Sequence, residues 1–298
     1  MGTFGLIVIG DEILSGKRAD KHLPKIIELL GARGLSLGWA EYVGDSPARI
    51  TAALQRAFAS GDVVFSTGGI GATPDDHTRQ CAARALGVDL VLHPEAAALI
   101  LERMQDIARE QGKPYEPERP DNAHRLNMGV FPAGAQIIPN PYNKIPGFSC
   151  YPPRPDMSAA GPPQGAKAPA GGSEPHAVGE RGGIHFVPGF PVMAWPMVEW
   201  VLDTLYPHRF TTGAWVEQSV IVFGAMEATL TPLMEAIERE HPGIRVFSLP
   251  SVDHPEYGRH IELGVKGAPV GVAPAWAALL QGLKAFDVKL GPELVRNQ

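Results

Sequence analysis

Hydrophobic positions in the first part of the chain follow two alternating patterns. Short continuous apolar runs, at residues 6–9 and 63–65, are typical of strands buried on both faces of a parallel sheet. Residues 20–30 and 47–60 instead carry apolar side chains at helical spacing, and each segment stops at a glycine. Strands that alternate with helices in this way predict an α/β fold with a doubly wound, mostly parallel sheet.

The pattern changes once more beyond Pro207. Residues 207–298 predict strands at 216–223, 244–249 and 260–266, a helix that opens at Thr231-Pro232, and a helix at 273–286. This order predicts a small α+β domain. We therefore expect two domains, at residues 1–206 and 207–298.

Residues 152–182 interrupt the first domain with a different composition. Proline, glycine, alanine and serine dominate there, with few large apolar side chains. Such a segment buries too little surface to offset its conformational entropy, so we expect a disordered insertion between two strands.

Composition excludes several classes of protein. The net charge of −6 argues against a general nucleic-acid or membrane-surface binder, because both need a basic surface. The 2 cysteines are too few for a disulfide framework. The N-terminal apolar run meets Asp11 and Glu12 directly, which predicts a strand and not a signal peptide. We expect a cytoplasmic protein with no membrane span.

The strongest candidate for a binding site is the stretch at residues 66–78, which follows an apolar strand. Gly68, Gly69 and Gly71 allow positive φ and close approach of backbone amides to an anion. Thr73 is expected to cap the next helix, with Asp76 three residues later. Strand, glycine loop and helix together are typical of a ligand corner in an open α/β sheet.

Two carboxylates, Asp75 and Asp76, lie inside this expected anion site. Carboxylates repel phosphate unless a cation or a proton lies between them, so the pattern favours a divalent cation such as Mg²⁺. The alternative is that both acids only complement a helix dipole. Combined with the glycine loop, the cation interpretation predicts a ligand that carries a phosphate or a pyrophosphate.

Other strand ends should meet this loop at one edge of the sheet. Lys17 and Arg18 could supply positive charge at this edge but are interpreted as a solvated basic pair. His77 could be a metal ligand or an acid/base group but is interpreted as an exposed histidine. The predicted substrate-binding residues are Gly10, Glu12, Ser15, Gly16, Thr67, Gly68, Gly69, Gly71, Thr73, Thr78, Pro188 and Gly189.

The sequence resembles a known family at five ordered stretches. Residues 67–78 are similar to the Thr-Gly-Gly-x-Gly-x-Thr-x-Asp-Asp-x-Thr signature of the molybdopterin-binding, MoaB/Mog-like domain, in the form found in CinA-type proteins. The other four stretches are residues 10–16, 43–45, 140–148 and 187–197. The amidase domain of full-length CinA proteins has no counterpart in this sequence.

This resemblance implies roles for two aspartates. Asp45 and Asp76 occupy the positions of the aspartates implicated in pterin-adenylylating Mog-like enzymes, which makes them the expected catalytic and metal-binding residues. Asp45 could instead begin a turn with Ser46 and Pro47. The resemblance also implies a homo-oligomer and, together with the expected cation, a phosphorylated pterin or a dinucleotide as ligand.

Three functions follow from the residues and the resemblance together. The first is metal-dependent hydrolysis of a nucleotide pyrophosphate such as ADP-ribose or FAD. The second is molybdopterin binding or adenylyl transfer in molybdenum cofactor biosynthesis, and the third is a binding module without turnover. The appended second domain favours the first, because Mog-like proteins are usually a single short domain.

Overall fold

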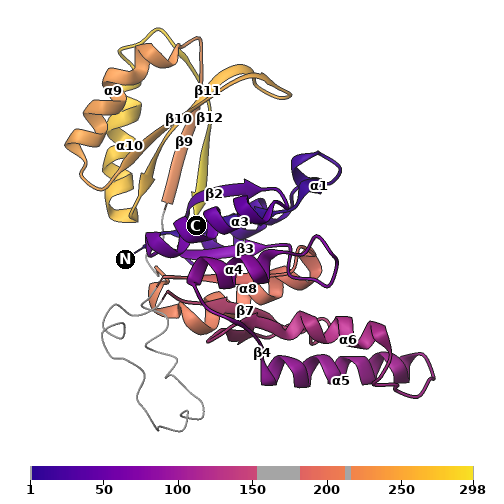
Figure 1. The fold of residues 1–298 in the computed structure, drawn as a ribbon. Helices are drawn as coiled ribbons and strands as arrows, with labels where there is room; N and C mark the ends of the chain where they lie inside the picture. The colour runs from indigo at the N-terminus through magenta and orange to yellow at the C-terminus, as the bar shows by residue number, and fades with distance from the viewer. Residues whose placement is uncertain (1, 153–181, 212–215, 298) are drawn as a thin grey trace, which may run out of the picture. The chain divides into compact units, whose positions relative to one another are not determined.

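The computed structural model describes residues 2–152, 182–211 and 216–297. The chain forms two compact units, one of residues 1–30 and 36–210 and the other of residues 31–35 and 211–298. Almost all of the expected insertion at 152–182 therefore lies outside the described residues. Each unit is described separately below (Figure 1).

The first unit is built on a six-stranded sheet with the order β2-β1-β3-β8-β7-β6. Neighbours among β2, β1, β3 and β8 run parallel, whereas β7 is antiparallel to both β8 and β6. The strands are β1 (Phe4–Ile9), β2 (Leu37–Val43), β3 (Val63–Thr67), β6 (Gln136–Ile138), β7 (Gly147–Cys150) and β8 (Gly183–Val187). The predicted doubly wound, mostly parallel sheet is confirmed.

Helices cover both faces of this sheet, because β1 and β3 are buried throughout and offer apolar side chains to each side. Ile7 and Ile9 join one core with α3 (Pro47–Ser60) and α4 (Thr78–Leu86). On the opposite face, the ring of Phe4 meets that of Tyr206 at 6.0 Å, just beyond α8 (Pro191–Leu205). Helix α2 (His22–Gly31) lies beside α8, where Lys25 Nζ stands 5.6 Å from the ring of Trp195.

Smaller elements complete this unit. A two-stranded antiparallel sheet pairs β4 (Leu90–Leu92), which the sequence pattern did not predict, with β5 (Val130–Pro132). Helix α5 (Pro94–Glu110) lies beside α6 (Pro120–Leu126) (Figure 1). The remaining elements are α1 (Asp11–Leu14) and the 3₁₀ helices Asn127–Gly129 and Pro207–Arg209.

The second unit is a four-stranded antiparallel sheet with the order β10-β11-β9-β12. Helices α9 (Glu227–Glu240) and α10 (Pro269–Leu283) pack on one of its faces (Figure 1). Its strands are β9 (Val216–Phe223), β10 (Arg245–His254), β11 (Gly258–Gly267) and β12 (Lys289–Asn297). The predicted α+β class is confirmed, although β12 was not predicted.

The expected start of α9 at Thr231-Pro232 is wrong. The helix begins at Glu227, and Thr231 Oγ1 donates to the Glu227 carbonyl at 3.2 Å. That bond is typical of a threonine in a helix interior and not of a cap.

In the described part of the chain, no helix has the length and hydropathy of a bilayer span.

Candidate functional site

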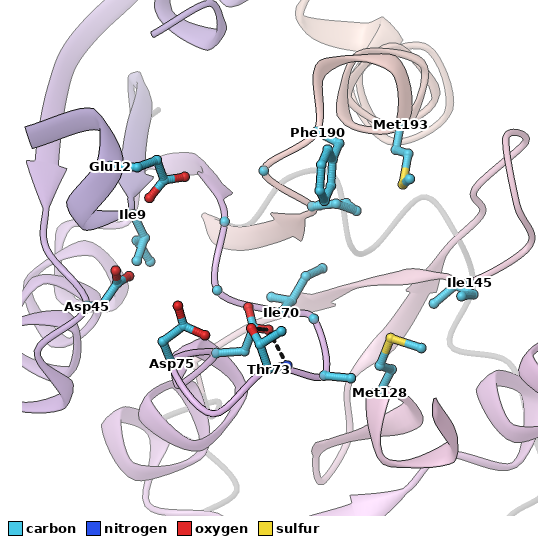
Figure 2. A pocket seen from close by; sticks show the side chains of 18 of the residues that line it. Ile9, Glu12, Asp45, Ile70, Thr73, Asp75, Met128, Ile145, Phe190 and Met193 are labelled. Carbon is cyan, nitrogen blue, oxygen red and sulfur yellow. Dashed lines mark hydrogen bonds between the residues drawn. The ribbon is translucent and has the colours of Figure 1, made fainter. Parts of the chain in front are cut away.

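A pocket of about 390 Å³ lies at the carboxyl ends of the parallel strands of the first unit (Figure 2). Strands β1, β2, β3, β6 and β8 all end at this edge of the sheet, so five loops meet there. The lining residues are Ile9, Gly10, Glu12, Arg18, Asp45, Gly68, Gly69, Ile70, Gly71, Ala72, Thr73, Asp75, Asp76, Met128, Asn140, Asn143, Ile145, Pro146, Pro188, Gly189, Phe190 and Met193.

The glycine loop after β3 forms the floor of the pocket. Gly68 and Gly69 have φ of 98° and 68°, a region that strongly favours glycine. The Gly68 amide donates to the Val187 carbonyl at 3.1 Å. Within the described residues, the amides of residues 69–72 donate to no protein acceptor. Four successive unpaired amides at the floor of a pocket are suited to binding an anion.

The turn after this loop differs from the prediction, because Thr73 does not cap a helix. Asp76 Oδ2 accepts hydrogen bonds from the Thr73 amide at 2.8 Å and from Thr73 Oγ1 at 2.5 Å, which closes a separate turn. Helix α4 begins only at Thr78, whose amide donates to the Gly69 carbonyl at 3.0 Å. The anchoring of Thr78 to the loop therefore sets the start of the helix.

Arg79 supports the loop from below. Its buried guanidinium donates to the Gly71 carbonyl at 2.7 Å and to the Asn127 carbonyl at 2.8 Å. Burial lowers the pKa of Arg79, and the charge of Asp76 opposes this. Arg79 thus fixes the Gly71 carbonyl of the loop without engaging the amides of residues 69–72.

One wall of the pocket is acidic. Asp45 Oδ2 accepts from the Asp11 amide at 2.9 Å, and Asp11 Oδ1 accepts from the Asp45 amide at 3.2 Å, so the two corners hold each other. Burial raises the pKa of Asp45, although the Asp11 hydrogen bond opposes this. Nearby carboxylates raise it further. These belong to Asp11, Glu12 and Asp75.

The acidic wall matches the chemistry of a hard divalent cation, since Glu12, Asp45 and Asp75 offer carboxylate oxygens. Among the described residues, however, no three His, Cys, Asp or Glu side chains are close enough to form a complete metal cluster. Magnesium usually takes only one or two carboxylates and completes its shell with water and substrate phosphate. A cation at this wall would therefore need water or ligand oxygens to complete its coordination.

The opposite wall is apolar (Figure 2). It is lined by Ile70, Met128, Ile145, Phe190 and Met193.

The loop between β6 and β7 gives this wall a fixed shape. The side-chain amide of buried Asn140 donates to the Ile145 carbonyl at 2.9 Å and to Asn143 Oδ1 at 2.8 Å. Lys144 Nζ binds Asp106 Oδ2 of α5 at 2.7 Å. The loop is thus anchored from both sides.

Most predicted site residues line this pocket, and four do not. Ser15 and Gly16 are exposed beyond α1, whereas Thr67 and Thr78 are buried beneath the loop. Thr78 Oγ1 donates to the Gly68 carbonyl at 3.1 Å and so acts on the loop from inside. The predicted residues that line the pocket are Gly10, Glu12, Asp45, Gly68, Gly69, Gly71, Thr73, Asp76, Pro188 and Gly189.

Several lining residues were missing from the predicted set. Arg18 is exposed, as interpreted, and also lines the pocket. Asn140 and Phe190 belong to stretches that carried the family resemblance, so their motifs could have identified them. For Met128 the sequence offers no signal.

The chain belongs to a family of probable molybdopterin binding domains, whose model matches residues 5–208. Its relatives include CinA-like proteins, which confirms the resemblance. A CinA-like protein of Geobacter metallireducens is 30% identical over 246 residues, which cover 81% of this chain and 50% of that protein. A protein of Pyrobaculum calidifontis is 28% identical over 88% of this chain and 87% of its own length.

Two solved structures resemble this chain over about two thirds of its length. A CinA protein of Thermoplasma acidophilum covers 68% of this chain and 97% of its own, with 24% identity and a TM-score of 0.49. The molybdopterin biosynthesis enzyme MoaB of Thermus thermophilus covers 70% of this chain and 94% of its own, with 20% identity and a TM-score of 0.38.

Proposed function

We propose that the pocket binds a nucleotide pyrophosphate, such as ADP-ribose or FAD, together with a divalent cation and hydrolyses it. The observation that carries this proposal is the construction of the pocket from two unlike walls. Unpaired amides and carboxylates lie on one side, and apolar side chains lie on the other. A dinucleotide has the matching parts, since a charged pyrophosphate joins flat heteroaromatic rings.

Charge supports the participation of a cation. The pocket is lined by four carboxylates, of Glu12, Asp45, Asp75 and Asp76, and by one cationic side chain, of Arg18. A pyrophosphate placed on residues 69–72 would face this excess of negative charge. A bound divalent cation would neutralise the pyrophosphate oxygens and polarise the phosphorus for attack.

Asp45 is the residue best placed to handle a proton. Its Oδ2 is engaged by the Asp11 amide, and among the described residues its Oδ1 is engaged by none. A raised pKa makes its carboxylate a better proton acceptor than an ordinary aspartate. We assign it the deprotonation of the attacking water, while residues 69–72 hold the pyrophosphate in position.

A second candidate is molybdopterin binding or adenylyl transfer, which the family model favours. A pterin ring with its phosphate would use the same two walls. The difference lies in the acceptor of the adenylyl group, which is water in the first case and molybdopterin phosphate in the second.

Release of AMP tests the proposal. The purified chain is incubated with ADP-ribose or FAD and with Mg²⁺, Mn²⁺ or a chelator. AMP that appears only with a metal supports hydrolysis, and its disappearance in Asp45→Asn, with normal turnover in Lys17→Ala, assigns it to the pocket. Binding without AMP release would indicate a binding module, and adenylylation of added molybdopterin by ATP would support the second candidate.

A further inference from the structure

Helix α2 carries a histidine where its pattern calls for an apolar residue. Its buried positions are His22, Ile26, Leu29 and Leu30, which recur at helical spacing. The three aliphatic side chains fill the space between helix and sheet. His22 stands in the same stripe and is only 5% exposed.

The imidazole of His22 reaches the pocket corner after β8. Its Nε2 lies 3.0 Å from the Gly189 carbonyl oxygen, and since a carbonyl only accepts, Nε2 is the donor. The other ring nitrogen, Nδ1, is buried without a partner among the described residues. A buried polar atom without a partner costs stability, so an aliphatic residue would serve the helix better. Such a departure from the packing rule is typical of a functional position.

Gly189 lies where the apolar wall meets the glycine loop. A Cβ built on Gly189 would stand 3.4 Å from Gly68 Cα, so this corner rests directly on the glycine loop. The next residue, Phe190, and Met193 one turn further on both line the apolar wall. The position of the Gly189 carbonyl therefore sets the spacing between glycine loop and apolar wall.

The histidine is itself held from the N-terminal side. Asp20 accepts hydrogen bonds from the amides of His22 at 2.8 Å and Leu23 at 3.1 Å, as an N-cap does. Asp20 also accepts from the Tyr42 hydroxyl of β2 at 2.7 Å. These hydrogen bonds attach the start of α2 to the sheet and so fix the backbone position from which the His22 ring extends.

We propose that His22 is a positioning residue of the pocket, which holds the Gly189 carbonyl and so keeps the apolar wall at the distance a ring-bearing ligand needs. The ligand part of this inference rests on the proposed function, and the structural part does not. Because the phosphate-binding amides belong to the glycine loop, loss of His22 should affect the ring more than the pyrophosphate.

Three variants separate positioning from plain stability. His22→Leu removes the donor and keeps the apolar stripe, whereas His22→Gln keeps an N–H of similar reach. Ile26→Val perturbs the same buried face one turn away from the Gly189 contact. The measurements are hydrogen exchange of the backbone at residues 189–193, and the affinities for ADP-ribose and for inorganic pyrophosphate with Mn²⁺.

We expect His22→Leu to speed exchange at residues 189–193 and to weaken ADP-ribose binding by ~10-fold, as loss of one well-placed hydrogen bond does. Pyrophosphate affinity should stay unchanged, His22→Gln should restore both readouts, and Ile26→Val should change neither. Unchanged exchange in His22→Leu, or an equal loss for both ligands, would overturn the assignment. If wild type binds neither ligand, the proposed function fails, and the exchange data still decide whether His22 holds Gly189.

Discussion

The two walls of the pocket are built in different ways. The acidic wall and the glycine loop come from residues that directly follow β1, β2 and β3, and they are held by hydrogen bonds to the backbone. The apolar wall is assembled from Ile70 of the glycine loop and from three further segments, at residue 128, residues 140–146 and residues 188–193. The acidic wall thus follows three neighbouring strands of the sheet, whereas the apolar wall depends on segments that are far apart in the sequence.

The largest loss of turnover is expected when one carboxylate of the acidic wall is removed. Asp45→Asn keeps the hydrogen bond with the Asp11 amide but removes the charge and the proton acceptor. We expect turnover of ADP-ribose to fall by ~10²-fold or more. Initial rates of AMP release measure this, and normal activity in a well-folded variant would contradict the role of Asp45.

The glycine loop should respond differently at two positions. A Cβ at Gly71 would stand 2.6 Å from Asp76 Oδ2, so Gly71→Ala should shift the glycine loop and its amides. We expect this to weaken pyrophosphate affinity by ~10-fold with a small change in melting temperature. Gly69 has positive φ, and its Cβ would meet buried Thr78 Oγ1 at 2.2 Å.

The alanine variant at Gly69 is thus the matched contrast. Gly69→Ala should destabilise the fold by about 1 kcal/mol or more. Thermal melts and calorimetric titrations on both variants check the pair. Equal affinity of wild type and Gly71→Ala for pyrophosphate would exclude the amide cradle.

Truncation of one side chain on the apolar wall should weaken the binding of a ring-bearing ligand more than the binding of pyrophosphate. Phe190 is 55% exposed at the pocket. Phe190→Ala removes a ring on which a base can stack, and we expect ~5-fold weaker binding of ADP-ribose, the lower part of the range for base stacking. Pyrophosphate affinity serves as the internal control. A parallel loss for both ligands would show that Phe190 supports the loop and not the ring.

The smallest expected effect is on stability against pH. Because the folded pKa of Asp45 is raised above the ordinary value of 3.8, the folded state holds this proton more tightly than the unfolded state. Stability from this group is therefore lost as pH rises through the interval between the two values. At neutral pH, the melting temperature of Asp45→Asn should be at most a few degrees above that of wild type. Near pH 3 the two melting temperatures should be equal. If the difference in melting temperature instead grew towards acid pH, the inferred direction of the Asp45 pKa shift would be wrong.

Sequence alone predicted the elements whose patterns are local. The bounds of α3, Pro47–Ser60, follow from periodicity, the proline that opens it and the glycine after it. The strand β12 was missed because its segment contains Gly291 and Pro292, and only pairing with β9 makes it a strand. The start of α4 was misplaced because Asp76 could satisfy either a helix cap or the turn that the structure contains.

The same distinction applies to the site. Gly68, Gly69 and Asp45 follow strands directly, so their common edge could be predicted from the order of elements. Met128 reaches the pocket only because α5 and the loop before β5 fold across the sheet edge, which no local pattern encodes. His22 gave no signal beyond a polar letter in an apolar stripe.

The reversed direction of β7 has a consequence for the two ends of the connection that follows it. Since β7 runs antiparallel to β8, the chain leaves β7 at Cys150 and enters β8 at Gly183 on the edge of the sheet opposite the pocket. The two described ends of this connection are thereby separated from the pocket by the length of β7 and β8. The reversal of direction at β7 thus keeps both ends of the connection out of the binding site.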